Sequence, residues 1–428
     1  MLVQNNNIEL FCSDKMQNKF QRFMSTDCVK HHDLKIEEID SGVICPPELA
    51  DGRKLFEDRA YGGVCYSDLS FCELSCPKRF SGDSPIVTVQ WFIGANPNLK
   101  KSDIGYVDEE VFFGGVLKNN IGHFMIENFS VMWPFLNRVD PKLKVVCLLQ
   151  GQEEPKQDVL RTFYSALGLN EESVIFLKEP TRFKKVIVAE QSMELQGRYH
   201  PIFKQLFDKV KLCAKPAKYK KIYFSKRITS SWTAESFGLS RHLGEEIAEP
   251  LFKKNGFYIV KPEKISMHEC ISLLNGCEVF AASSSSNAHH AFLLDDETRC
   301  FIFNRSPHVH PHQLMIDEMR KLRTTYVDSC AQSLPVHWSQ GPFIFMFTKY
   351  LKAFMDKYNF KYNEQLLISQ THDLFWEFTA SWAHAVSEDS VYRQCEELAH
   401  IDETNLLQLC EEFKKPLAKK SLFSFFRK

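Results

Sequence analysis

The fold of this chain is set by residues 111–135, which read VFFGGVLKNNIGHFMIENFSVMWPF. An apolar run ends in two glycines and an asparagine-rich loop, and a helical pattern then begins at Gly122-His123. A spacing of four places His123 and Glu127 on one face of that helix, one turn apart. A titratable pair at the end of a strand-to-helix turn is typical of proton-transfer sites in α/β proteins, and also of a satisfied structural pair.

Strands and helices alternate on both sides of this stretch. A helix is expected over residues 157–167, where Gly168 ends it. Alternation of this kind predicts a parallel sheet with both faces covered by helices. Short apolar runs predict its strands at residues 86–92, 110–113, 144–149, 173–177 and 185–189.

A second α/β unit follows the basic, proline-containing segment 211–221, which we interpret as a linker. Four strands with helices between them predict a Rossmann-like half. Its strands are expected at residues 221–225, 257–260, 278–282 and 300–303, with helices at 241–254, after the capping box Ser266–Glu269 and from about Asn287. Residues 331–428 show helical patterns, such as 347–358 and 374–385.

Composition narrows the class of protein. The 428 residues carry 53 Lys and Arg against 54 Asp and Glu, so the sequence predicts no nucleic-acid partner. No basic segment followed by an apolar one begins the chain, and no run approaches twenty apolar residues, so we expect a soluble, cytoplasmic protein. The 14 cysteines are scattered through apolar patterns and are expected to pack as small core residues.

Four serines form the second candidate site. Ser283, Ser284, Ser285 and Ser286 lie between a predicted strand and the predicted helix start at Asn287. Helix N-termini bind phosphates through unpaired amides, and serine hydroxyls add donors. An ordinary serine cap before a polar loop would give the same pattern. The carboxyl end of a strand in an open α/β sheet favours ligand binding.

Ser225-Lys226-Arg227 follows the first strand of the same unit, so its cations are expected at the same sheet edge. They could neutralise a diphosphate without a metal, or they could form a solvated basic turn.

Two histidine groups are weak candidates for a metal site. His289 and His290 are adjacent and would point about 100° apart on a helix. His308, His310 and His312 alternate, but Pro311 predicts an exposed loop there. The gaps between Cys65, Cys72 and Cys76 do not fit a zinc ribbon. We therefore expect no metal and no other cofactor.

The C-terminal residues 414–428 combine six cations with leucine and phenylalanine. This composition suits an anionic membrane surface, or a disordered terminus.

Several of these motifs in succession resemble family 61 glycosyltransferases, particularly bacterial members near surface-polysaccharide loci. The resemblance covers about residues 85–305 and rests on segments 112–127, 221–227, 256–263 and 279–292. Family members usually carry a glycine-rich stretch where this chain has Ser283 to Ser286. Their arginine after the serine is displaced here by Lys226, with Arg227 following.

The resemblance implies an α/β fold of two Rossmann-like domains facing a cleft (GT-B type), with a helical C-terminal region. The expected parts are an N-terminal elaboration (1–84), an acceptor domain (85–215), a nucleotide-sugar domain (216–330), a helical region (331–413) and a basic aromatic tail (414–428).

The implied activity is inverting transfer of a sugar from a nucleotide-sugar donor to a hydroxyl of a bacterial surface or capsular glycan. His123 would be the base and Glu127 would orient it, or the reverse. The expected donor-binding residues are Ser225, Lys226, Arg227, Ser283, Ser284, Ser285, Ser286, Asn287 and His289, and the expected acceptor-binding residues are Asn119 and Asn120. The alternatives are a non-catalytic nucleotide- or carbohydrate-binding protein on this fold, and a metal-dependent hydrolase built on the histidines.

Overall fold

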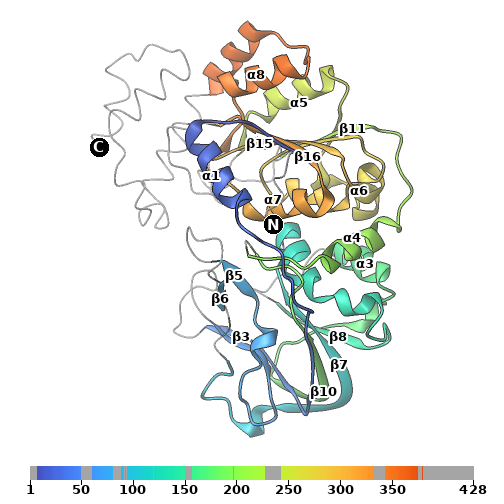
Figure 1. The fold of residues 1–428 in the computed structure, drawn as a ribbon. Helices are drawn as coiled ribbons and strands as arrows, with labels where there is room; N and C mark the ends of the chain where they lie inside the picture. The colour runs from blue at the N-terminus through green and yellow to red at the C-terminus, as the bar shows by residue number, and fades with distance from the viewer. Residues whose placement is uncertain are drawn as a thin grey trace.

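A computed structural model gives a mixed α/β fold built on two large sheets, as the alternation of strands and helices predicted (Figure 1). Short segments outside the sheets add two small two-stranded ladders. The residues that the structure describes are 7–49, 60–80, 88–90, 92, 94–118, 120–149, 157–195, 197–226, 242–330, 343–374 and 378.

The first large sheet has six strands, all parallel. In spatial order they are β1 (Ile8–Phe11), β16 (Arg323–Asp328), β15 (Arg299–Asn304), β14 (Val279–Ser283), β11 (Lys221–Phe224) and β13 (Tyr258–Val260). From β11 the chain proceeds to β13 on one side and then to β14, β15 and β16 on the other. This reversal puts a topological switch point between β11 and β14, where open α/β sheets bind ligands at their carboxyl ends.

The second large sheet has seven strands and mixes parallel with antiparallel pairs. Its strands are β4 (Ala60–Cys65), β3 (Val43–Leu49), β10 (Thr181–Ala189), β7 (Gly105–Leu117), β8 (Lys144–Leu149) and β9 (Val174–Phe176), with β2 (Ile36–Asp40) also paired to β10. The parallel strands run in the order β9, β8, β7, β10, so the chain reverses between β7 and β10. A second switch point therefore lies at the ends of those two strands.

The helices cover the sheets, and the helix expected over residues 157–167 ends before Gly168 as predicted. Gly168, Gly256 and Gly276 have φ of +83°, +82° and +73°, the left-handed backbone that stops a helix at little cost to glycine. The helices are α1 (Asp14–Met24), α2 (Ile121–His123), α3 (Gln157–Ala166), α4 (Ile202–Lys211), α5 (Glu245–Lys254), α6 (Met267–Leu274), α7 (Pro311–Arg320) and α8 (Lys349–Lys357). The short 3₁₀ or π segments are η1 (Glu73–Ser75), η2 (Lys101–Asp103), η3 (Phe124–Asn128), η4 (Phe129–Val131), η5 (Trp133–Leu136), η6 (Glu171–Ser173), η8 (Pro262–Lys264) and η9 (Ala288–Leu293). The small ladders pair β5 (Lys78–Phe80) with β6 (Thr88–Gln90), and β12 (His242–Leu243) with β17 (Phe343–Ile344).

Two local predictions were wrong. Pro311 does not lie in a loop, because it is the first residue of the ten-residue helix α7. At this position the backbone N–H that proline lacks would make no hydrogen bond within the helix. The helix expected from about Asn287 is the six-residue 3₁₀ segment η9, which is too short to act as a helix terminus for phosphate.

The N-terminal residues are shared between the two large sheets. Strand β1 pairs in parallel with β16, and the backbone amide of Ser13 donates to Asp328 at 2.8 Å. The chain then crosses to the seven-stranded sheet, where β2 pairs with β10. These residues contain no long apolar run, so their pairing depends on strands far along the sequence.

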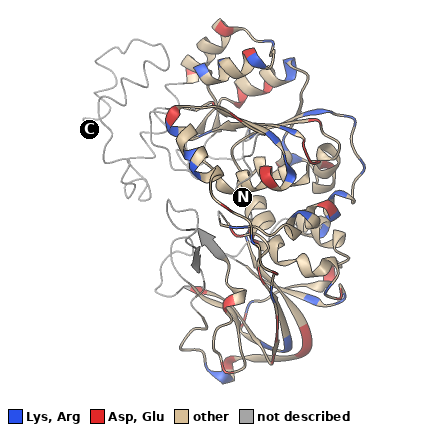
Figure 2. Cartoon of the chain, viewed as in Figure 1, with Lys and Arg blue, Asp and Glu red and all other residues tan. Residues whose placement is uncertain are grey.

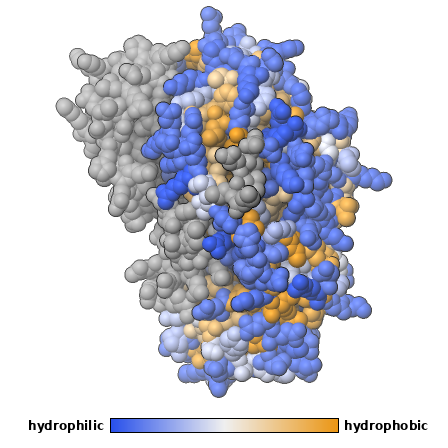
Figure 3. All heavy atoms as spheres, viewed as in Figure 1, coloured by the Kyte–Doolittle hydropathy of each residue, from blue (hydrophilic) through white to orange (hydrophobic). Residues whose placement is uncertain are grey.

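One continuous hydrophobic core contacts both large sheets. Phe207 of α4 stacks on Phe292 of η9, with ring centroids 4.3 Å apart and planes 11° apart. Charged residues of both signs are spread along the described ribbon (Figure 2). Polar residues cover most of the described surface in the face shown (Figure 3). Of the helices in the described ranges, none has the length and apolar character needed to cross a bilayer.

Candidate active site

His123 and Glu127 meet at the end of β7, at the switch point of the seven-stranded sheet. His123 Nδ1 contacts Glu127 Oε2, and Lys118 Nζ lies 3.5 Å from each of these atoms. The Glu127 side chain is 5% exposed, whereas that of His123 is 33% exposed. Because the carboxylate holds Nδ1, the ring nitrogen left for other chemistry is Nε2.

The helix that carries this pair is not regular. Residues 121–123 form a single α-turn, and Phe124–Asn128 continue as a π-helix. The sequence spacing predicted the contact between His123 and Glu127 but not the π-helix. π-Helical segments are rare in proteins as a whole, but those that occur are often found at functional sites.

Two asparagines precede the pair. The Oδ1 atom of Asn120 accepts from the amides of Gly122 at 2.9 Å and His123 at 3.2 Å, so this side chain caps the turn that presents the imidazole. Asn119 lies outside the described residues.

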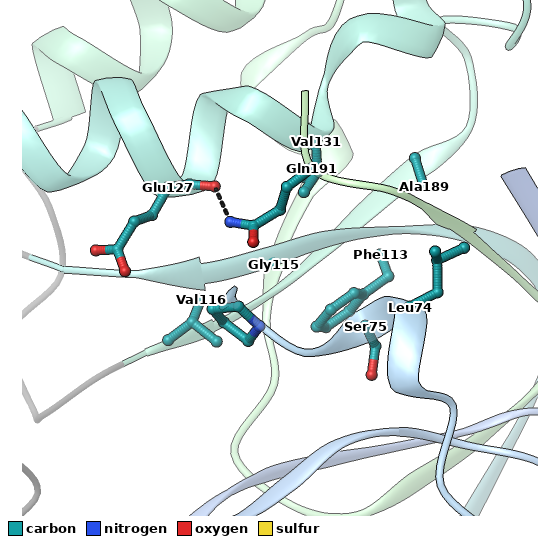
Figure 4. A pocket seen from close by; sticks show the side chains of 10 residues that line it. Leu74, Ser75, Phe113, Gly115, Val116, Glu127, Val131, Ala189 and Gln191 are labelled. Atoms are coloured by element: carbon teal, nitrogen blue, oxygen red, sulfur yellow. Dashed lines mark hydrogen bonds between the residues drawn. The ribbon is translucent and has the colours of Figure 1, made fainter. Parts of the chain in front are cut away.

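A small pocket, lined by residues of β7, η1 and the end of β10, opens beside Glu127 (Figure 4). The Gln191 amide donates to the Glu127 carbonyl at 3.3 Å, and the Glu127 carboxylate extends away from Gln191. Most of the other lining residues are apolar, namely Leu74, Pro77, Phe113, Val116, Val131 and Ala189. This apolar pocket lies beside the carboxylate at the sheet edge, as the switch point would place a ligand site.

The serine tract lies directly against the start of the His123 turn. A Cβ atom added at Gly122 would lie 2.9 Å from His289 Nδ1 and 3.1 Å from Ser286 Cβ. The contact between these two segments could not be predicted from the sequence, because they are more than 160 residues apart. The switch points of both sheets therefore contribute to one site.

Within the tract, two serine hydroxyls hold the loop itself. Ser285 Oγ accepts from the Asn287 amide at 3.2 Å, and Ser284 Oγ accepts from the Arg305 amide at 3.2 Å. Ser283 Oγ lies 3.5 Å from Ser285 Oγ. These bonds match the structural interpretation of a serine turn.

Ser286 differs, because its hydroxyl faces the cation of the neighbouring strand end. Lys226 Nζ lies 3.5 Å from Ser286 Oγ. Burial, together with repulsion from Arg305, lowers the pKa of Lys226 to about 8.

Ser225 and Asn287 fix the register between these strand ends. The side-chain amide of Asn287 donates to the Ser225 backbone carbonyl at 3.2 Å, and the Ser225 hydroxyl donates to the Glu249 carboxylate at 2.7 Å. Arg227 lies outside the described residues.

Buried histidines surround the serine tract. His289 and His312 are in edge-to-face contact with ring centroids 4.3 Å apart, and His310 lies next to His312. Burial lowers the pKa of His312 to about 3 and that of His290 to about 4, and lowers those of His289 and His310 as well, so all four rings are neutral near pH 7.

The expectation that the alternating histidines would be exposed is wrong for His312, which is 4% exposed. His289 Nδ1, His310 Nε2 and both ring nitrogens of His312 are buried without a hydrogen-bond partner. Across the described ranges, no group of three or more His, Cys, Asp or Glu side chains is arranged to hold a metal ion. A small pocket lined by His289, His310, Ser284 and Ser285 lies among these atoms.

Sequence reasoning missed three residues of this site: Lys118, His312 and Arg305. Lys118 follows β7 and Arg305 follows β15, so the rule that strand ends carry function would have found both. His312 was discounted because Pro311 was interpreted as a loop residue.

Comparison with known proteins gives one family. No curated protein is significantly similar to this chain. Residues 121–301 match the family described as Glycosyltransferase 61, and this span runs from the turn that carries His123 to the third strand of the second α/β unit, β15. The match agrees with the family that the sequence motifs resemble, and over residues 121–301 the chain is similar to the glycosyltransferase 61 family.

Proposed function

We propose that this protein is an inverting, nucleotide-sugar-dependent glycosyltransferase of GT-B type, with its active site between the His123 turn and the serine tract. The observation that carries the proposal is the packing of Gly122 against His289 and Ser286, because it brings the proton acceptor and the cationic strand end into one site. Similarity to this family supports glycosyl transfer, and the two switch points support a ligand bridging the sheets.

In the proposed reaction, His123 Nε2 takes the proton of an acceptor hydroxyl. The acceptor oxygen attacks the anomeric carbon, and the bond from that carbon to the phosphate oxygen breaks. The electron pair leaves with the phosphate, and attack from the opposite face inverts the anomeric configuration. Glu127 fixes the tautomer of His123 and stabilises the imidazolium that forms, as a carboxylate behind a histidine base does.

The donor phosphates would lie at the ends of β11 and β14. Lys226 supplies positive charge there, and the Ser286 hydroxyl supplies a donor. Preorganised donors and cations aimed at the developing charge are among the largest contributions to catalysis. The short 3₁₀ segment after Asn287 plays no part in this proposal.

We propose a hydroxyl of a bacterial surface or capsular glycan as the acceptor, supported by the motif resemblance. The tail 414–428, which lies outside the described residues, would hold the protein at an anionic inner membrane surface through its cations and phenylalanines.

The test begins with a thermal-shift screen of nucleoside diphosphates and nucleotide sugars on the full chain. Hits are then assayed for donor hydrolysis and for transfer to glycan acceptors, with His123→Ala as the matched negative. Transfer by the wild type and its loss in the variant support the proposal. Tight binding of nucleotide sugars without turnover would instead identify a non-catalytic binding protein.

A further inference from the structure

Arg305 lies at the carboxyl edge of the six-stranded sheet, immediately after β15. Its backbone amide donates to Ser284 Oγ at 3.2 Å, which ties it to the serine tract. Ser286 follows β14 and Arg305 follows the neighbouring strand β15, so the two residues lie at the same edge of the sheet. The sequence motifs in this region pointed to serines and histidines and did not single out Arg305.

Among the residues that the structure describes, no carboxylate pairs with the guanidinium of Arg305. Nη1 lies 3.2 Å from His242 Nε2, and the group stacks 3.8 Å from the centre of the Phe343 ring. Nε is buried and makes no hydrogen bond, and over the described ranges no ion pair connects this arginine to a carboxylate. Burial lowers the pKa of Arg305 to about 9, which leaves it positively charged at pH 7.

Arg320 is a second arginine inside the protein, and its contacts with carboxylates are those of a structural residue. Its side chain is 2% exposed, and Nη1 contacts Asp208 and lies 3.3 Å from Asp296. Two carboxylates thus lie next to Arg320, whereas no carboxylate of the described residues pairs with Arg305. Arg305 is half-buried, with its Nε atom fully buried. A desolvated charge without a partner destabilises the fold, so its presence at a strand end requires another reason.

A second cation stands nearby. Repulsion from Arg305 contributes to the lowered pKa of Lys226, which places both positive charges within electrostatic reach of each other. Burial and the nearby charge of Arg305 lower the pKa of both His242 and His310. Both rings are therefore neutral near pH 7 and do not compensate the positive charge of Arg305. Two neighbouring cations that are both partly removed from solvent attract an anion that carries more than one charge.

We propose that Arg305 is a donor-phosphate-binding residue which, together with Lys226, holds the departing phosphate groups. The inference rests on the proposed function and adds a residue to it. When the anomeric bond breaks, the electron pair goes to the phosphate oxygen, and the two cations stabilise the charge that develops there. Without ligand, the charge of Arg305 has no partner and weakens the fold.

The experiment compares Arg305→Met, Arg305→Lys and Arg299→Gln with the wild-type full chain. Arg299 begins the same strand, at its opposite end, and its guanidinium lies over the ring of Tyr358, so its variant is the matched control. Thermal unfolding and titration calorimetry are run without ligand, with inorganic phosphate, with inorganic pyrophosphate, and with UDP or GDP.

We expect Arg305→Met without ligand to unfold at the wild-type temperature or above it, because an unpaired buried charge has been removed. We also expect its Kd for pyrophosphate and for the nucleoside diphosphate to rise about tenfold or more, the effect of one hydrogen bond to a charged group. Arg305→Lys should recover part of the affinity, and Arg299→Gln should match the wild type.

Three outcomes overturn the assignment. Pyrophosphate affinity unchanged in Arg305→Met would remove Arg305 from the site. A large fall in its unfolding temperature without ligand would make Arg305 a structural residue. Failure of the wild type to bind pyrophosphate or either nucleotide would mean that no such anion site exists. If binding depends on Arg305 while no donor is ever turned over, the proposed transferase activity fails and the anion site stands.

Discussion

The contact between His123 and Glu127 allows the base to be identified by comparing two substitutions. Glu127→Gln keeps the size of the side chain and an oxygen that can accept from Nδ1, but it removes the negative charge. His123→Ala removes the ring whose Nε2 is free to take a proton. If His123 is the base, His123→Ala should lower kcat by a much larger factor than Glu127→Gln.

The magnitudes follow from the geometry. Loss of a positioned general base costs roughly a hundredfold to ten-thousandfold in turnover, which is our expectation for His123→Ala. The contact from Glu127 to the ring is a hydrogen bond that becomes charge-assisted when the imidazolium forms. Losing its charged part should cost on the order of 1.5 kcal/mol in the transition state, which is about tenfold in kcat.

The assay measures release of nucleoside diphosphate and transfer to acceptor at saturating donor, so that kcat is separated from KM. Glu109→Gln is the matched control, because Glu109 lies on the same strand β7 and its ion pair with Lys144 is exposed. Added imidazole should partly restore His123→Ala, because the ring position is one-third exposed. An inactive Glu127→Gln beside a His123→Ala variant within tenfold of wild type would make Glu127 the base. Near-normal kcat in both would refute the whole assignment.

Four further predictions concern the surroundings of the pair. Gly122→Ala should lower the rate of transfer at least about tenfold while the chain stays folded, because the new Cβ would lie only 2.9 Å from His289 Nδ1 and 3.1 Å from Ser286 Cβ. Steady-state kinetics and circular dichroism test this prediction, and an unchanged kcat would contradict it. Phe292→Ala should destabilise the fold by about 3–5 kcal/mol by removing the ring stacked on Phe207, measured by urea unfolding, and a loss below about 1 kcal/mol would show that the stack is unimportant. Burial raises the pKa of Glu245 from 4.5 to about 7, so the folded state binds its proton more tightly; the resulting stability is present below pH 4.5 and is lost as pH rises through 7, on the order of 3 kcal/mol. Urea unfolding at pH 5 and pH 8 should therefore show less decline for Glu245→Gln than for wild type, and equal slopes would show that Glu245 is ionised throughout. Removal of residues 414–428 should abolish flotation with anionic liposomes, and equal flotation of the 1–413 protein would remove the membrane proposal.

The sequence was sufficient for features that depend on neighbours along the chain. Apolar runs located β8, β11, β14 and β15 to within two residues. The capping box is real, since Ser266 Oγ accepts from the Glu269 amide at 3.1 Å. The four-residue spacing of His123 and Glu127 predicted their contact, because residues on one helical face are held together by the local backbone alone.

Features that depend on distant partners could not be inferred in this way. Strand β1 has no strong apolar pattern and is held by β16, more than 300 residues later. Arg305 carries no local sequence signal, and it differs from Arg320 in that no carboxylate of the described residues pairs with it. Pro311 was expected to break structure, yet it begins α7, because the first residue of a helix needs no amide.

The amino-acid sequence by itself determined the α/β class, the positions of strands β8, β11, β14 and β15 and the pairing of His123 with Glu127, since each follows from short-range periodicity and capping. Only the tertiary structure brought Gly122 against His289 and Ser286, added Arg305 to the same sheet edge and buried the histidines around it. These contacts depend on how two sheets with separate switch points pack through a shared core, and that packing energy is not encoded in any single segment.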